Sequence, residues 1–201
     1  MKKNTNNFIN TYINNLYKTL QNIDQTKLIK CKSLILNKIK NNKNIYVCGN
    51  GGASSISNHL LCDFNKNIKN SSKGNNLKPK VISFSSNTDL LTAIANDISY
   101  DNIFSHQLEN FARKGDLLIL FSCSGTSKNI IKVAQFAKIK KIEIISFTAF
   151  KRLSKLEALS KIFMNLNINN YGIAEDVFQS IMHIISQMIR VENSYKKIKI
   201  L

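Results

Sequence analysis

Two short segments rich in glycine and serine each follow an apolar run and precede a stretch with helical spacing. Residues 49–55 read GNGGASS, and residues 122–127 read SCSGTS. Glycines let a ligand approach the backbone closely, and the free amides at a helix start attract anions. The four hydroxyls of the second segment suit a dianionic phosphate, whereas an ordinary helix cap needs only one. We therefore expect the two segments to bind one phosphate-bearing ligand.

The first segment differs from two common nucleotide-binding motifs. No Gly-Lys-Ser/Thr follows residues 49–55, so the segment is not a P-loop. It also lacks the full glycine spacing of a dinucleotide fingerprint. Both motifs are excluded for this loop.

Acid, base and metal-ligand side chains follow the first segment and recur near the end of the chain. His59 and Asp63 are four residues apart and share one helix face, as do Glu175, Gln179 and His183. A histidine and a carboxylate on one face can bind zinc if other ligands converge. His183 lies among apolar neighbours, so a buried histidine with only a structural role is equally compatible with the sequence.

The segments between these residues alternate between short apolar runs and helical stretches. We expect strands over 44–48, 81–85, 116–122, 141–147 and 161–166, and helices over 55–64, 88–97, 101–113, 127–139, 152–160 and 172–194. This order predicts an α/β fold, a three-layer αβα sandwich around a five-stranded parallel sheet. Both Gly/Ser segments would then lie at the carboxyl ends of strands, where such folds bind ligands.

Two more periodic stretches, 4–24 and 27–41, precede the first strand. We expect a single domain over residues 1–201, with helices over 1–42 and the αβα core over 43–201. The polar segment 65–80 contains the one proline and is expected to be a surface loop. The first helices could pack on their own domain or on a partner subunit.

The chain carries a formal net charge of +17 over 201 residues. Lysine supplies 26 of the 29 basic residues and arginine only three, and they are scattered along the chain. Because recognition of base edges and phosphates favours arginine, we expect no nucleic-acid partner. The charge would at most attract anionic substrates.

The sequence also bears on the compartment. It has no run of about 20 apolar residues and no apolar leader with a cleavage site, so we expect a cytoplasmic protein without a membrane partner. The four cysteines, at positions 31, 48, 62 and 123, have neither metal-site spacing nor a paired pattern. They are expected to be reduced thiols.

Three motifs in order, GNGGASS (49–55), ANDISYDNIF (95–104) and FSCSGTSKNII (121–131), resemble the SIS (sugar isomerase) domain family. The similarity covers nearly the whole chain and is greatest to phosphoheptose isomerases. It implies a flavodoxin-like fold and an aldose–ketose isomerase, an intramolecular oxidoreductase. The implied substrate is sedoheptulose 7-phosphate, converted to D-glycero-D-manno-heptose 7-phosphate, or a related sugar phosphate. The resemblance also implies a homotetramer with sites at subunit contacts.

The resemblance assigns roles to individual residues. Asp63 matches the proposed base, and His183 is assigned as the acid. Zinc is the one cofactor implied, with His59, Asp63, Gln179 and His183 as candidate ligands. Cys123 stands where a serine or threonine is common. The residues expected to bind substrate are Asn50, Gly51, Gly52, Ser54, Asp97, Ser122, Cys123, Ser124, Ser127 and Gln179.

Two departures from the family pattern bear on catalysis. Asp63 stands where the family has a glutamate, and a displacement of about 1 Å can lower a rate by about 100-fold. On the last helix the family has a glutamine and a histidine eight residues apart. In this sequence that spacing falls on Phe178 and Ser186 or, shifted by one residue, on Gln179 and Gln187. His183 then either replaces the usual acid from one turn earlier or is unrelated to it. These departures favour an alternative, a non-catalytic SIS protein that binds a phosphosugar or another protein.

Overall fold

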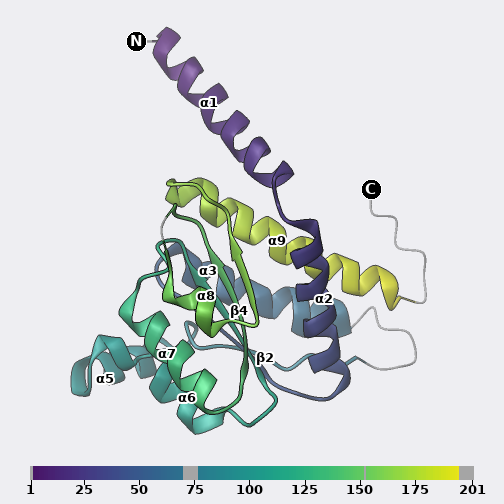
Figure 1. Cartoon of the computed structure of the whole chain (residues 1–201), viewed down its shortest axis with the longest axis vertical. Coiled ribbons are helices and arrows are strands. Elements are labelled where there is room, and N and C mark those ends of the chain that lie inside the picture. Colours follow the sequence, from purple (N-terminus) through teal and green to yellow (C-terminus); the bar gives the residue numbers. More distant parts are fainter. Residues whose placement is uncertain (1, 70–76, 152, 195–201) are drawn as a thin grey trace.

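The computed structural model describes residues 2–69, 77–151 and 153–194 (Figure 1). Its centre is a five-stranded sheet with the strand order β2-β1-β3-β4-β5. All four pairings are parallel, which confirms the predicted sheet. The strands are β1 (Ile45–Gly49), β2 (Val81–Ser83), β3 (Leu117–Ser122), β4 (Glu143–Thr148) and β5 (Ile162–Asn165).

Helices connect the strands and cover both faces of the sheet. They are α1 (Lys2–Gln21), α2 (Gln25–Lys40), α3 (Gly52–Leu61), the π-helix η1 (Cys62–Ile68), α5 (Thr88–Asp97), the 3₁₀-helix η2 (Tyr100–Asn102), α6 (Ser105–Phe111), α7 (Lys128–Ile139), α8 (Lys155–Leu159) and α9 (Tyr171–Glu192). Within the described residues, no helix is both long enough and apolar enough to cross a bilayer.

Alternate residues of the strands supply two separate hydrophobic cores. Leu117, Ile119 and Phe121 of β3 pack in the core beneath α2, α3 and α9, together with buried residues of those helices. Leu118 and Leu120 of the same strand pack in the second core, beneath α5, α6, α7 and α8. This alternation is what a sheet covered on both faces requires, and it establishes the three-layer arrangement.

Helix α1 differs from the other helices because much of it extends away from the body (Figure 1). Its Tyr12 hydroxyl donates a hydrogen bond to Asp176 of α9 at 2.9 Å. Four of its apolar side chains, Phe8, Ile9, Ile13 and Tyr17, form an exposed stripe. By contrast, α2 buries Leu28, Cys31, Ile35 and Ile39 in the first core.

The structure corrects two predicted boundaries. Helix α3 begins at Gly52, inside the first Gly/Ser segment, and η1 continues it to Ile68, where we expected a loop to start at residue 65. Burial of Phe64 and Ile68 in the first core explains this continuation. Asn65 also bonds both the N–H and the C=O of Val81, so it serves as a partner for the edge of β2. Most of the remaining predicted loop, 70–76, lies outside the described residues.

The predicted helix 101–113 forms two shorter helices, η2 and α6. Ile103 and Phe104 lie between the two helices and are buried in the second core.

Phe178 offers a test of how α9 packs in the first core. Its ring is fully buried, with its centroid 5.7 Å from that of Phe121 and 6.2 Å from that of Phe147. Phe178→Ala should lower the free energy of unfolding by about 3–5 kcal/mol, measured by urea denaturation, because it leaves a cavity among aromatic rings. Ile184→Ala, on the exposed side of the same helix, should lower it by less than about 1 kcal/mol. Equal losses of unfolding free energy would contradict the assignment of Phe178 to the buried face of α9 and Ile184 to its exposed face.

Candidate active site

Both Gly/Ser segments line a single hollow of about 420 Å³. The register of the sheet explains why they meet. Gly49 at the end of β1 pairs with Phe121 near the end of β3, so Asn50 and Ser122 leave the sheet side by side. The residues lining the hollow are Asn50, Gly51, Gly52, Ala53, Phe121, Ser122, Cys123, Ser124, Ser127, Tyr171 and Glu175.

A reciprocal amide pair joins the two segments. Asn50 donates to the side-chain oxygen of Asn129 at 3.0 Å, and Asn129 donates to that of Asn50 at 2.8 Å. Asn129 lies in the first turn of α7 and is buried. The Tyr100 hydroxyl also donates to the Asn50 oxygen, at 3.2 Å. The sequence analysis missed Asn129 and Tyr100, although both lie within the motifs quoted for the family.

The serines of the second segment are not used equally by the fold. Ser122 accepts a hydrogen bond from the Gly125 N–H, and Ser124 accepts one from the Thr126 N–H. Ser127 is the N-cap of α7, yet its hydroxyl makes no capping bond. Thr126, the fourth hydroxyl residue, does not line the hollow. A cap role therefore does not account for Ser127, whose hydroxyl remains available to a ligand.

Close packing at the start of α3 depends on glycine. Gly51 has a φ of 56°, a conformation that other residues rarely adopt. A Cβ atom on Gly52 would lie 2.2 Å from a carboxyl oxygen of Glu175. The Glu175 side chain thus occupies the space that a larger residue at position 52 would need.

Further along α9 and the helix formed by α3 and η1, a second cluster contains the acid, base and metal-ligand candidates. His183 Nδ1 lies 2.8 Å from a carboxylate oxygen of Asp63, and His59 Nε2 lies 3.8 Å from the other oxygen. Gln179 Nε2 lies 3.0 Å from His183 Nε2. Ligand atoms of the two histidines and Asp63 all lie within 4.8 Å of one another. The four residues proposed as zinc ligands therefore converge.

Asp63 is the buried member of this cluster, with 7% of its surface exposed. It is the second residue of η1, and Asn67, one turn later, donates to its second oxygen at 3.3 Å. π-Helical turns often occur at functional sites, because they redirect side chains relative to a regular helix. Here the shorter side chain of aspartate still reaches His183.

A second register of the family's glutamine and histidine fits the last helix as well. Glu175 and His183 are themselves eight residues apart, which is the separation of that pair. In this register His183 would take the place of the family's histidine and Glu175 that of its glutamine.

The positions of Ser54, Asp97 and Cys123, which were also expected to bind substrate, suit that role less well. Ser54 lies in α3, where its hydroxyl donates to the Gly51 carbonyl, and it does not line the hollow. Asp97 ends α5, is exposed and accepts a hydrogen bond from Asn96. The Cys123 thiol lines the hollow, but burial, together with the charge of Glu175, raises its pKa to about 11. That thiol is therefore protonated near neutral pH and is not a nucleophile.

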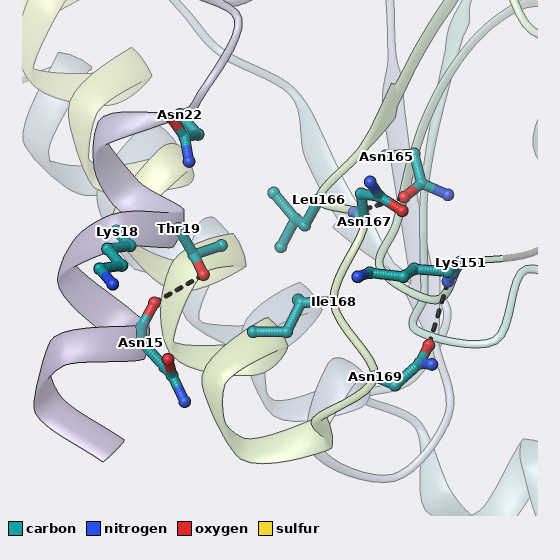
Figure 2. A pocket seen from close by; sticks show the side chains of 10 residues that line it. All are labelled: Asn15, Lys18, Thr19, Asn22, Lys151, Asn165, Leu166, Asn167, Ile168 and Asn169. Atoms are coloured by element: carbon teal, nitrogen blue, oxygen red, sulfur yellow. Dashed lines mark hydrogen bonds between the residues drawn. The ribbon is translucent and has the colours of Figure 1, made fainter. Parts of the chain in front are cut away.

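A separate hollow of about 510 Å³ lies between α1 and the segment that follows β5 (Figure 2). Asparagine and lysine side chains dominate its lining, including Lys18 of α1 and Lys151. It contains none of the residues expected to bind substrate. We therefore place the candidate active site at the Gly/Ser hollow and the Asp63–His183 cluster.

Comparisons with known proteins agree with this placement. A family model described as SIS domain matches residues 9–149. The phosphoheptose isomerase of Helicobacter hepaticus is 31% identical over 163 residues, which cover 81% of each chain. That of Helicobacter pylori strain P12 is 30% identical over 181 residues, covering 90% of this chain and 91% of the relative.

A solved structure supports the fold independently. The phosphoheptose isomerase GmhA from Neisseria gonorrhoeae superposes with a TM-score of 0.82 at 22% identity. The match covers 94% of this chain and 97% of that one. The sheet, the two loops and these similarities lead to one conclusion, that the chain belongs to the SIS domain family.

Proposed function

We propose that this protein is an aldose–ketose isomerase that converts sedoheptulose 7-phosphate, or a closely related ketose phosphate, to the corresponding aldose phosphate. The observation that carries the proposal is the unused Ser127 hydroxyl at the start of α7, which lines the hollow shared by both Gly/Ser segments. A helix start with an uncommitted hydroxyl suits a phosphate group. The named activity of the relatives above supports the same assignment.

In this proposal the phosphate binds against Ser122, Ser124 and Ser127, and the sugar extends along α9 toward His183. Glu175 and His183 are eight residues apart, which corresponds to about 12 Å along a helix. The loops therefore hold one end of the substrate, while the cluster faces the other end. Such positioning contributes much of the rate in reactions that need only proton transfers.

The chemistry assigned to the cluster is a pair of proton transfers. Asp63 removes a proton from C1 of the ketose while His183 protonates the carbonyl oxygen on C2, which gives an enediol. Asp63 then returns its proton to C2, and the hydroxyl on C1 gives its proton back to His183, leaving an aldehyde at C1. The contact between His183 Nδ1 and Asp63 orients the ring.

The first test concerns the phosphate loop. Ser127→Ala should weaken binding of sedoheptulose 7-phosphate by about tenfold, since a lost hydrogen bond to a charged group costs roughly 1.5 kcal/mol or more. Its stability should hardly change, because the hydroxyl makes no capping bond. Calorimetric titration and thermal unfolding measure the two effects.

Asn87→Ala is the matched control for Ser127→Ala. Asn87 caps α5 through a bond from the Leu90 N–H to its side chain, and it does not line the hollow. This variant should lose about 1 kcal/mol of stability and keep its affinity. The phosphate assignment is wrong if Ser127→Ala loses stability like a cap and binds the ligand as before.

The second test concerns the base. Asp63→Asn keeps the shape of the side chain but cannot accept the C1 proton, so turnover should fall by at least about 100-fold. Interconversion can be followed by NMR, with circular dichroism to confirm folding. Asp89→Asn, at an exposed position on α5, should leave turnover unchanged. If the unaltered protein binds the phosphosugar without converting it, the non-catalytic alternative is correct instead.

We further propose that the cluster binds zinc. The donors fit this metal, because zinc accepts histidine nitrogen and aspartate oxygen in four-coordinate sites. His59, Asp63 and His183 provide three such donors, and Gln179 lies against His183. With zinc bound, Asp63 and His183 would serve as ligands, and the ion would supply Lewis-acid polarisation of the substrate carbonyl in place of the acid. The protein contributes the positions of the ligands, through α3, η1 and α9.

Zinc binding can be tested apart from activity. Titration with Zn²⁺ after dialysis against a chelator should give one site per chain, and both His59→Ala and His183→Ala should remove it. His106→Ala alters the remaining histidine, which is outside the cluster, and should keep the site. Equal zinc binding by all three variants would show that the metal binds elsewhere.

We also propose self-association and a cytoplasmic location. The exposed apolar stripe of α1, with Phe8 70% exposed and Tyr17 59% exposed, supports contact with a second copy, and the family resemblance favours a tetramer. The free thiols of Cys31, Cys48, Cys62 and Cys123 suit a reducing compartment.

A further inference from the structure

Another hollow, of about 500 Å³, borders the second Gly/Ser segment outside the candidate active site. Ser124 and Ser127 line the Gly/Ser hollow, whereas Gly125 and Thr126, which lie between them in the sequence, line this other hollow. The second Gly/Ser segment is therefore a wall that the two hollows share. A ligand in the other hollow would contact the same loop that is proposed to bind the substrate phosphate.

Three lysines give this hollow a positive charge, and we call it the lysine hollow. Lys128 and Lys132 are one turn apart on α7, and Lys155 begins α8, which packs against α7. Within the part of the chain that the structure describes, none of the three ammonium groups forms an ion pair or a hydrogen bond. Asp101 of η2 is the one acidic residue in the lining, whose net formal charge is therefore +2. A concave surface of one charge sign concentrates ions of the opposite sign.

The size and the lining of the lysine hollow favour an organic diphosphate. Its volume falls in the range of sites for small organic ligands, roughly 300–1,000 Å³. Lys128 and Lys132 are about 6 Å apart along the helix axis, so two linked phosphates can contact both ammonium groups. Asp101 can accept hydrogen bonds from ribose hydroxyls, as acidic residues do in dinucleotide sites. Leu153, which is 93% exposed, offers an apolar surface to a base.

Gly125 connects the two hollows through both of its backbone polar groups. Its N–H donates to the carbonyl and hydroxyl oxygens of Ser122, at 3.0 Å and 3.1 Å. Its carbonyl accepts a hydrogen bond from the Ser154 hydroxyl at 2.6 Å, and Ser154 directly precedes Lys155. A Cβ atom on Gly125 would lie 2.7 Å from that hydroxyl, so the two residues are tightly packed. A ligand held by Lys155 would therefore act on the loop that carries the phosphate-binding serines.

We propose that the lysine hollow binds a nucleoside diphosphate and that this ligand lowers the affinity of the Gly/Ser hollow for its phosphosugar. The second part rests on the proposed function, because it assumes a phosphate against Ser122, Ser124 and Ser127. A bound diphosphate neutralises the lysines beside the shared segment and repels a second phosphate on its other hollow. By linkage, the phosphosugar weakens binding of the diphosphate by the same factor.

The first test measures binding of ADP and of inorganic pyrophosphate by calorimetry. The double variant Lys128→Gln/Lys132→Gln should bind both at least about tenfold more weakly, because each lost contact with a charged group costs roughly 1.5 kcal/mol or more. The matched control is Lys27→Gln/Lys30→Gln, which removes two exposed lysines of α2 outside the hollow and should bind both like the parent. The parent should also bind ADP more tightly than pyrophosphate, because the nucleoside adds contacts.

Three outcomes of this test would overturn the proposal. Equal losses in the two double variants would show attraction by net charge alone. Absence of ADP binding by the parent would remove the site. Pyrophosphate binding as tight as that of ADP would remove the nucleoside from the assignment.

Ser127→Ala separates the lysine hollow from the Gly/Ser hollow. It should bind ADP like the parent, since Ser127 lines only the Gly/Ser hollow of these two. Its affinity for sedoheptulose 7-phosphate should fall, as predicted above. ADP binding that is lost in Ser127→Ala and kept in Lys128→Gln/Lys132→Gln would place the nucleotide in the Gly/Ser hollow and overturn the proposal.

The last test measures the coupling, in an Asp63→Asn background that blocks turnover. Saturating ADP should raise the Kd for sedoheptulose 7-phosphate by at least about fivefold, a typical size for coupling between two sites. Adding Lys128→Gln/Lys132→Gln should abolish this effect. An unchanged Kd would overturn the regulatory role and leave the isomerase assignment intact. A parent that binds ADP but never the phosphosugar would overturn the proposed function and the coupling, but not the nucleotide site.

Discussion

The pairing of β1 with β3 is the constraint on which the site depends. The two strands are adjacent and parallel, with Gly49 opposite Phe121, so the segments that leave them emerge at the same edge. Neither segment alone encloses a hollow, and only their adjacency brings the starts of α3 and α7 together. The reciprocal bonds between Asn50 and Asn129 then fix the distance between the segments. This pre-organisation lowers the entropy lost when a ligand binds.

Helix α9 connects this edge of the sheet to the acid–base cluster. Its buried face packs in the first core through residues such as Phe178 and Ile181, which fixes the helix relative to the sheet. Glu175 and His183 project from it two turns apart, one beside Gly52 and the other beside Asp63. Gly52 belongs to α3 and Asp63 to η1, which continues α3 along the chain. In the proposed isomerase, this pair of packed helices would set the spacing between the phosphate end and the reacting end of the substrate.

Much of this arrangement could be predicted from the sequence, because it follows from local patterns. Apolar runs gave the five strands, and the composition of 49–55 and 122–127 indicated the loops that line the hollow. The π-helix could not be predicted, since Phe64 and Ile68 are buried only once the first core has formed. The bond between Asn50 and Asn129 joins residues 79 positions apart and depends on strand order. Glu175 was recognised in the sequence as sharing a helix face with Gln179 and His183, but its place beside Gly52 depends on how α9 packs against α3.

The charge of the hollow differs from that of the whole protein. The chain has a net charge of +17, yet no lysine or arginine lines the hollow, and its one ionisable side chain that can carry charge near neutral pH is Glu175. The phosphate proposed to bind here would therefore be held by hydroxyls, amides and helix starts, which act only at hydrogen-bond range. The surface lysines act differently, because their field attracts anions from a distance and is screened over about 10 Å at ordinary ionic strength. In this proposal the surface lysines attract the anionic substrate from a distance, whereas the hollow recognises its phosphate at close range. Recognition in the hollow then depends on the geometry of the hydrogen-bonding groups rather than on positive charge.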